Sequence, residues 1–184
     1  MKQLPKSFFA RDTVEVAKEL LGKIIYVNGF RGRIVETEAY GRDPASHAFK
    51  KTERSKIMFD TYGHVYVYLI YGMYDCINFT TEKNEAGAVL IRAVEPLNKI
   101  DQLKKRRKTD KITNLCSGPG KLCQAFGIDR NLNGLKLGKE VKVYDDSFRV
   151  GKIGQSSRVG IKDALDLQWR FFVFDNHFIS KVKN

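Results

Sequence analysis

The segment Glu36-Thr37-Glu38-Ala39-Tyr40 contains the side chains of this chain that are best suited to acid–base chemistry. It lies at the end of an expected strand, whose alternation places Glu36, Glu38 and Tyr40 on one face. A carboxylate at a strand end can act as a general base on water. An isolated Glu-x-Glu pattern is more often part of a solvated outer face. The otherwise apolar strand, and the loop with His47 that follows it, favour the chemical role.

A second segment, residues 66–74, places four tyrosines around Gly72. Aromatic rings are surfaces on which nucleobases stack. The same alternation is also typical of a strand buried on both faces, and core packing is the more frequent outcome of this pattern. Tyr71 differs from the other tyrosines because a ring at a turn tip has little core to reach. It is therefore a candidate wedge between stacked bases.

Two polar residues interrupt apolar runs and need partners if they are buried. Arg92 lies within residues 88–94, and Asn78 lies between Ile77 and Phe79. For Arg92 the alternatives are a structural ion pair and a cation beside a phosphate or a catalytic carboxylate. For Asn78 they are a hydrogen bond to a sheet bulge and a contact with the edge of a base.

The 184-residue chain has a formal net charge of +12, from 33 Lys and Arg against 21 Asp and Glu. This excess predicts affinity for polyanions such as nucleic acids. On charge alone, a basic enzyme without such a partner is the alternative. A hydrophobic content of 42% predicts a globular fold. No apolar run reaches about eighteen residues, so no membrane partner is expected.

The three cysteines form no Cys-x-x-Cys pair, which predicts reduced thiols and a cytoplasmic location. The three histidines are scattered, so neither a zinc site nor an iron–sulfur cluster is expected. Residues 99–108 hold six basic side chains and predict a solvated basic face. The run Gly118-Pro119-Gly120-Lys121 lacks the spacing of a nucleotide-binding phosphate loop.

Hydrophobic periodicity predicts one mixed α/β (α+β) domain over residues 1–184, built on an antiparallel sheet. Helices are expected after a cap at Asp12 or Thr13, after Pro96, and before Gly127. Residues 41–63 are expected to be irregular. Strands are expected at residues 24–27, 33–40, 65–71, 74–81, 86–94, 140–144, 158–161, 171–174 and 178–182, with a tight turn at Asn28-Gly29.

Three motifs, at residues 33–40, 66–74 and 115–122, resemble the alkyladenine (3-methyladenine) DNA glycosylases of the mammalian type. The resemblance spans essentially the whole chain and is weakest over residues 129–157. It implies a single catalytic domain with a curved antiparallel sheet, surrounding helices and a protruding β-hairpin that intercalates into DNA. It also implies base-excision repair: alkylated or deaminated purines are flipped out of duplex DNA and the N-glycosidic bond is hydrolysed.

The resemblance implies that Glu38 activates the attacking water, leaving an abasic site. Arg92 would hold this carboxylate and the water, and the backbone carbonyl of Val159 would be the water's other partner. Tyr40 and His47 would line one face of the flipped purine. The remaining implied residues are Tyr68 on the other face of the base, Asn78 beside purine position 2, Tyr71 as the intercalating wedge, and Met73, Tyr74, Lys121 and Arg158 as DNA-binding candidates.

No lysine in the matched motifs stands where a Schiff-base nucleophile is expected, which implies a monofunctional hydrolase without lyase activity. The family uses no metal or bound cofactor. The implied partner is double-stranded DNA with damaged purines, and the implied state is a monomer in the cytoplasm, or with the nucleoid in a bacterium. The motifs do not rank 3-methyladenine, 7-methylguanine, hypoxanthine and ethenoadenine as substrates, and they identify no general acid.

A non-catalytic module that binds DNA or structured RNA is the alternative function. The positive charge and the tyrosines serve both functions equally well. The pairing of Glu38 with Arg92 favours the enzyme, because a protein that only binds nucleic acid gains nothing from a carboxylate facing phosphates.

Overall fold

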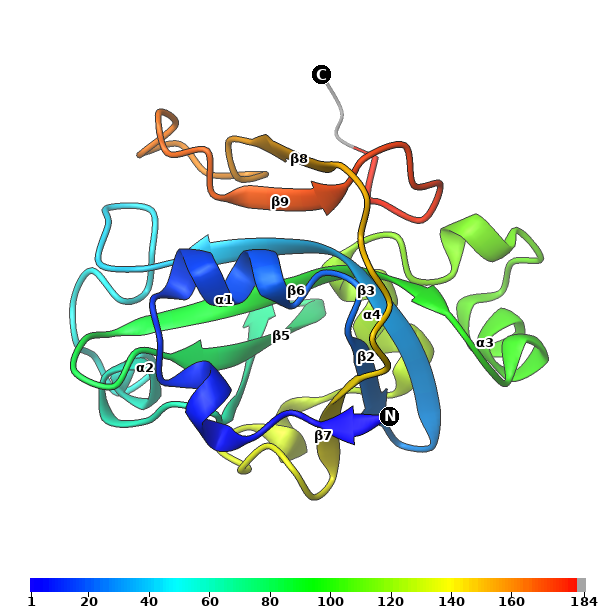
Figure 1. The fold of residues 1–184 in the computed structure, drawn as a ribbon, viewed down its shortest axis with the longest axis horizontal. Helices are drawn as coiled ribbons and strands as arrows, with labels where there is room; N and C mark the ends of the chain where they lie inside the picture. Colours follow the sequence, from blue (N-terminus) through cyan, green and yellow to red (C-terminus); the bar gives the residue numbers. More distant parts are fainter. Residues whose placement is uncertain (182–184) are drawn as a thin grey trace.

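The fold is seen in a computed structural model that describes residues 1–181 (Figure 1). Its antiparallel strands follow the order β1-β7-β2-β3-β6-β5-β4, and the β8–β9 pair joins at β3. The strands are β1 (Lys2–Gln3), β2 (Ile24–Val27), β3 (Phe30–Tyr40), β4 (Val65–Ile70), β5 (Tyr74–Thr81), β6 (Gly87–Pro96), β7 (Val141–Asp145), β8 (Ile153–Ser156) and β9 (Arg170–Val173). The expected single mixed α/β domain with a curled antiparallel sheet is thus confirmed.

The helices cover this sheet. In Figure 1, α1 lies across β3 and β6, which it contacts, while α4 packs on β5 and β6. The helices are α1 (Thr13–Glu19), α2 (Lys56–Asp60), α3 (Ile100–Arg107) and α4 (Pro119–Phe126), with short 3-10 turns at Lys6–Phe9, Ile112–Asn114 and Arg130–Leu132. None of the helices within residues 1–181 has the length and apolar character needed to cross a membrane.

Local sequence signals account for the first elements. The Asp12 side chain caps α1 by accepting from the Glu15 amide at 2.9 Å, as expected of an aspartate before a helix. Asn28 and Gly29, both with positive φ, form the two-residue turn that joins β2 to β3. Phe30, Phe79 and Phe126 are among the largest fully buried side chains. The three cysteines are free and buried.

Three expected elements are wrong. Pro96 ends β6 instead of opening a helix, and α3 begins only at Ile100. Residues 158–161 form no strand, because the Arg158 side chain turns into the interior and Gly160 has a φ of +77°. Residues 178–181 form a turn and a bend instead of a strand, and the last residue of that expected strand, Val182, lies outside the described residues.

β3 is the element that positions the site. It pairs with β6 along most of its length, while its other edge pairs first with β2 and then with β9. Its register with β6 passes from Ile34–Val94 to Glu36–Ala93 and then to Thr37–Ile91. One residue is therefore skipped on each strand: Val35 on β3 and Arg92 on β6. Such bulges bend a strand and re-aim side chains.

Candidate active site

The β3–β6 bulges bring Glu38 and Arg92 together in the interior. Glu38 is fully buried, and Arg92 is only 7% exposed. Arg92 Nη1 lies 3.3 Å from Glu38 Oε2. Both carboxylates of the Glu-x-Glu pattern are therefore inside the protein, and the solvated outer face is wrong for both.

Glu38 also accepts two hydrogen bonds that fix its orientation. The Tyr40 hydroxyl donates to Oε2 at 2.8 Å, and the Val159 amide donates to Oε1 at 2.6 Å. Burial and the Glu38 charge raise the pKa of Tyr40 well above its usual value, so its hydroxyl remains a donor. Glu38 is thus held by a cation and two neutral donors at the inner end of β3.

Glu36 is also fully buried and is connected to Glu38 through Arg92, which contacts both carboxylates. Its Oε1 accepts from the Nε atoms of Arg92 at 2.8 Å and Arg170 at 2.7 Å, and Ser180 donates through its amide and hydroxyl. Burial raises the pKa of Glu36, but the charges of Arg92 and Arg170 outweigh burial and hold it below the usual value.

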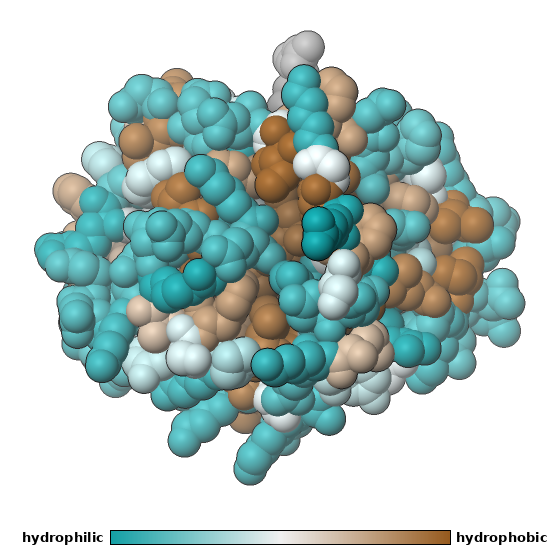
Figure 2. All heavy atoms as spheres, in the orientation of Figure 1, coloured by the Kyte–Doolittle hydropathy of each residue, from teal (hydrophilic) through white to brown (hydrophobic). Residues whose placement is uncertain are grey.

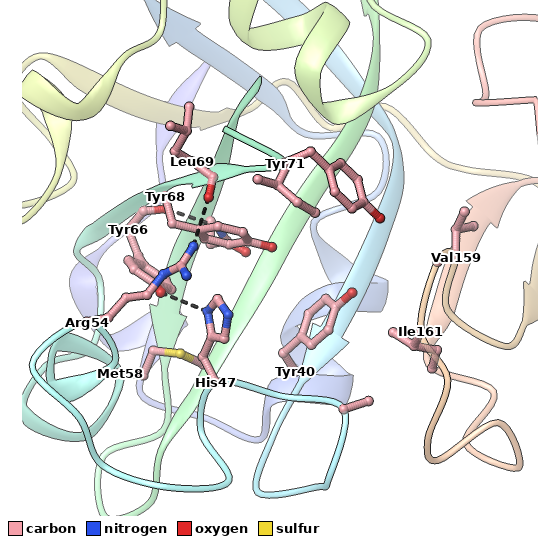
Figure 3. Close-up of a pocket in the computed structure, with 14 residues that line it drawn as sticks. Tyr40, His47, Arg54, Met58, Tyr66, Tyr68, Leu69, Tyr71, Val159 and Ile161 are labelled. Atoms are coloured by element: carbon pink, nitrogen blue, oxygen red, sulfur yellow. Dashed lines mark hydrogen bonds between the residues drawn. The ribbon is translucent and has the colours of Figure 1, made fainter. Parts of the chain in front are cut away.

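A cavity of about 300 Å³ is lined by Tyr40 and Val159, the two residues that donate hydrogen bonds to Glu38 (Figure 3). This volume is at the lower end of the range for small-molecule sites. Figure 3 shows Tyr40 and Tyr68 entering it from different strands. Its other lining residues combine aliphatic side chains with aromatic and polar ones, the latter being His47, Arg54, Tyr66, Tyr71 and Asn78.

His47 contacts the tyrosines of β4. Its Nδ1 lies 2.9 Å from the Tyr66 hydroxyl, and its ring meets Tyr68 edge-on, with 4.8 Å between centroids. This spacing leaves no room for a base between His47 and Tyr68, so a purine stacked on Tyr68 would face Tyr40. Burial and the nearby Arg54 lower the pKa of His47, which favours the neutral imidazole.

Asn78 forms part of the cavity wall and is 3% exposed. Its Nδ2 donates to the carbonyls of Tyr66 at 3.0 Å and Cys76 at 3.2 Å. These bonds use both protons of the amide and leave Oδ1 without a hydrogen-bond donor among the described residues. These are backbone bonds within a regular part of the β4–β5 pair and not at the sheet bulge of the structural alternative, and the free oxygen is compatible with a contact to a base.

The β4–β5 hairpin ends at the Ile70–Tyr74 pair, with Tyr71 and Gly72 at its tip. Tyr71 is 76% exposed, Met73 70% and Tyr74 50%. Gly120 of α4 packs against this hairpin so closely that an added Cβ would lie 3.0 Å from Tyr74 Cβ. The tip thus presents three large apolar side chains to solvent on a braced strand pair.

A second cavity, of about 600 Å³, adjoins the first and shares Tyr40, Tyr68, Tyr71 and Val159 with it. It is lined on its far side by α4 and by basic groups. Lys121 Nζ bonds to Asn114 Oδ1 at 2.6 Å. Burial and the nearby Arg107 and Lys181 charges lower the pKa of Lys121. Two donors to Glu38, Tyr40 and Val159, line both cavities, and the third, Arg92, lines the second.

The sequence comparisons agree with this arrangement. A sequence model of the family described as Methylpurine-DNA glycosylase (MPG) matches residues 7–177. That match decides the family. The chain belongs to the methylpurine-DNA glycosylases. The resemblance seen in the sequence motifs is confirmed.

Individual relatives of this glycosylase span nearly the whole chain. A Clostridium novyi protein is 45% identical over 200 residues, covering 98% of this chain and 100% of the relative. An Agrobacterium fabrum protein is 45% identical over 181 residues, covering 97% of this chain and 93% of the relative. A Methanoculleus marisnigri protein is 44% identical over 189 residues, covering 97% of this chain and 98% of the relative. All three are provisionally named 3-methyladenine DNA glycosylase, which supports a DNA glycosylase role for the chain.

Arg158, an expected DNA contact of the glycosylase, lies in the interior. Its side chain is fully buried and forms a two-point pair with Asp43, at 3.0 and 2.6 Å. It also donates to the Ala39 carbonyl at 3.1 Å and lies over the Tyr40 ring. This placement argues against contact with DNA, and it fixes Arg158 next to Val159, whose amide donates to Glu38.

Other site residues were missed by the sequence reasoning. Arg170 and Ser180 hydrogen-bond to Glu36 although they lie 134 and 144 residues away in the sequence, so no local pattern indicates them. Asp43 and Arg54 lie in the segment that was expected to be irregular, part of which forms α2. Among residues 1–181, no three His, Cys, Asp or Glu side chains cluster as a potential metal site.

Proposed function

We propose that this protein is a monofunctional glycosylase that flips damaged purines out of duplex DNA and hydrolyses their N-glycosidic bond. The observation that carries the proposal is the fully buried Glu38, oriented by three donors that themselves line the adjoining cavities. A solvent-excluded carboxylate with fixed geometry suits transition-state stabilisation more than phosphate binding. This position favours the enzyme over a module that only binds nucleic acid.

The proposed reaction begins with the purine in the aromatic cavity, stacked between Tyr68 and Tyr40. The sugar C1′ then lies beside Glu38. As the bond from C1′ to the purine nitrogen breaks, its electron pair leaves with the base and positive charge develops on the sugar. Glu38 stabilises that charge and accepts a proton from the water that attacks C1′. The Val159 carbonyl is the water's second proposed partner.

Alkylated purines suit this site because they need little help to leave. A purine methylated at N3 or N7 is cationic and departs as a neutral base. A neutral lesion such as hypoxanthine requires a proton on its departing purine. The neutral imidazole favoured at His47 is a poor source of that proton. We therefore propose cationic alkylpurines as the faster substrates.

Glu38→Gln tests the mechanism. We expect it to retain binding to lesion DNA and to lower single-turnover excision from methylated DNA by about 10²–10⁴-fold, the usual loss of a general base. Glu95→Gln, at the far end of β6, is the matched control and should excise at the parent rate. A Glu38→Gln rate within a few-fold of the parent would remove Glu38 from the mechanism.

The absence of lyase activity needs a separate measurement. Lys121 lines the second cavity, but its Nζ is engaged by Asn114. Borohydride reduction during turnover traps any Schiff base between a lysine and the sugar. We expect no covalent protein–DNA adduct, and an adduct lost in Lys121→Gln would show that the enzyme is bifunctional.

A further inference from the structure

Glu36 is an unusual buried group because four hydrogen bonds converge on one carboxylate. Its Oε1 accepts from Arg92, Arg170 and the Ser180 hydroxyl, and its Oε2 accepts from the Ser180 amide at 2.6 Å. A buried carboxylate is strongly unfavourable unless it is paired in this way. The general-base role of Glu38 does not by itself account for Glu36.

The partner shared by the two glutamates is Arg92. Its Nε bonds to Glu36, its Nη2 bonds to the Ser180 hydroxyl at 3.2 Å, and its Nη1 faces Glu38. A guanidinium is a planar, rigid fork of donors. Fixing Nε and Nη2 therefore determines where Nη1 points, and the direction of Nη1 determines its distance from the catalytic carboxylate.

Arg170 supports the same arrangement from β9. Its Nη1 donates to the Ser156 hydroxyl at 3.0 Å on β8, while its Nε holds Glu36. The two carboxylates and two guanidiniums balance in formal charge. Neither arginine is thus left as an uncompensated charge in the interior.

We propose that Glu36, Arg170 and Ser180 are positioning residues that aim Arg92 at Glu38. Residues 174–181, the red end of the ribbon in Figure 1, are therefore part of the catalytic apparatus because they deliver Ser180. This inference rests on the proposed function. It assigns a catalytic consequence to a network whose alternative role is structural, as a buried ion cluster.

Ser180→Ala is the most selective test because it removes one hydroxyl and leaves the charges in place. We expect the maximal single-turnover rate of 3-methyladenine release from methylated DNA to fall about tenfold. A misplacement of about 1 Å can cost up to 10²-fold in rate. The enzyme concentration that gives half the maximal rate should change less than about threefold, because Ser180 does not face either cavity. Ser180→Thr keeps the hydroxyl and should recover most of the rate.

Thr37→Val is the matched control for lost stability. Thr37 lies between the two glutamates on β3, but its hydroxyl bonds to the Ala17 carbonyl in α1 at 2.9 Å. The Thr37→Val substitution removes a buried hydroxyl that does not contact Arg92. We expect it to lower the free energy of unfolding about as much as Ser180→Ala, while its maximal rate stays within about twofold of the parent.

The outcomes separate the inference from the function on which it rests. If the parent excises 3-methyladenine and Ser180→Ala does so at the same maximal rate, the positioning role is overturned and the proposed function stands. Equal losses in Ser180→Ala and Thr37→Val, or in Ser180→Ala and Ser180→Thr, would likewise overturn it by showing a packing effect. A parent protein that releases no base would overturn both.

Discussion

Tyr71 has a left-handed backbone conformation, with a φ of 52°, next to Gly72 with a φ of 68°. That conformation costs an L-amino acid with a side chain about 1–2 kcal/mol. Tyr71 is 76% exposed, so it gains little from burial. A strained, exposed aromatic residue at a hairpin tip is better explained by a binding role than by folding.

Tyr71→Gly tests this explanation because it should move stability and activity in different directions. The free energy of unfolding, measured in urea, should stay level or rise by up to about 1 kcal/mol, because glycine adopts positive φ freely. Excision of a paired lesion should slow, because nothing then fills the gap left by the flipped base.

The control for Tyr71→Gly is the same lesion in a bulge, where unstacking is easier and the loss of rate should be smaller. Equal loss in paired and bulged DNA would rule out a wedge. A loss of several kcal/mol in stability would show that Tyr71 is a packing residue.

At the scale of elements, the Asp43–Arg158 pair joins the loop after β3 to the segment after β8. Both side chains are buried. The segment that contains Arg158 also supplies the Val159 amide that holds Glu38. The pair thus connects a contact deep in the fold to the orientation of the proposed general base.

Asp43→Asn should lower the free energy of unfolding by about 3–5 kcal/mol, because it leaves the Arg158 charge buried without a carboxylate. The double variant Asp43→Leu with Arg158→Met removes both charges and should recover much of that loss. The exposed two-point pair of Arg11 and Glu19 is the matched control.

For this control, Glu19→Gln should change stability by no more than about 1 kcal/mol. Urea unfolding of the four proteins measures these differences. A small effect of Asp43→Asn would mean that water or another group replaces the carboxylate.

Strands with clear hydrophobic periodicity were predictable from the sequence. The β2–β3 turn, the β4–β5 pair and the end of α4 at Gly127 lie where expected. The end of β6 was not predictable, because proline is compatible both with the first turn of a helix and with the end of a strand. The absence of a strand at residues 158–161 depends on the distant Asp43, which local patterns do not register.

The site was predictable where one motif contained it and where the family resemblance placed Arg92 beside Glu38. Tyr40 and Glu38 are two residues apart and do form a hydrogen bond. The bulges that bring Arg92 to both glutamates could not be predicted, because strand alternation assumes an unbroken register. The roles of these residues in catalysis and DNA binding remain predictions.

For the whole molecule, most charged side chains lie on the surface, and a small group of paired charges lies in the interior. The face seen in Figure 2 is dominated by hydrophilic side chains, as expected for a net charge of +12. Inside, Glu36 and Glu38 are fully buried, and their basic partners Arg92 and Arg170 are nearly so. Glu36 links stability to pH, because its carboxylate must remain ionised to keep its pairing with Arg92 and Arg170.

Acid should weaken the fold through Glu36. Its pKa is lowered in the folded state from a reference of 4.5, so below that pH the unfolded chain binds more protons. The stabilisation from Glu36 is therefore present above about pH 4.5 and is lost as pH falls through the folded-state value. The stability gap between the parent and Glu36→Gln, measured by urea unfolding, should narrow in that range. A gap that stays constant from pH 7 to about pH 3 would contradict this linkage.

The burial of the three cysteines affects how the protein reacts with alkylating agents. Burial raises the pKa of Cys76 to about 11 and of Cys116 to about 12, and it raises that of Cys123 well above its usual value. Methylating agents attack the thiolate, which these groups hardly form at neutral pH. We therefore expect its cysteines to react slowly with the reagents that would create this enzyme's proposed substrates. Little of its activity should then be lost through cysteine alkylation during such an exposure.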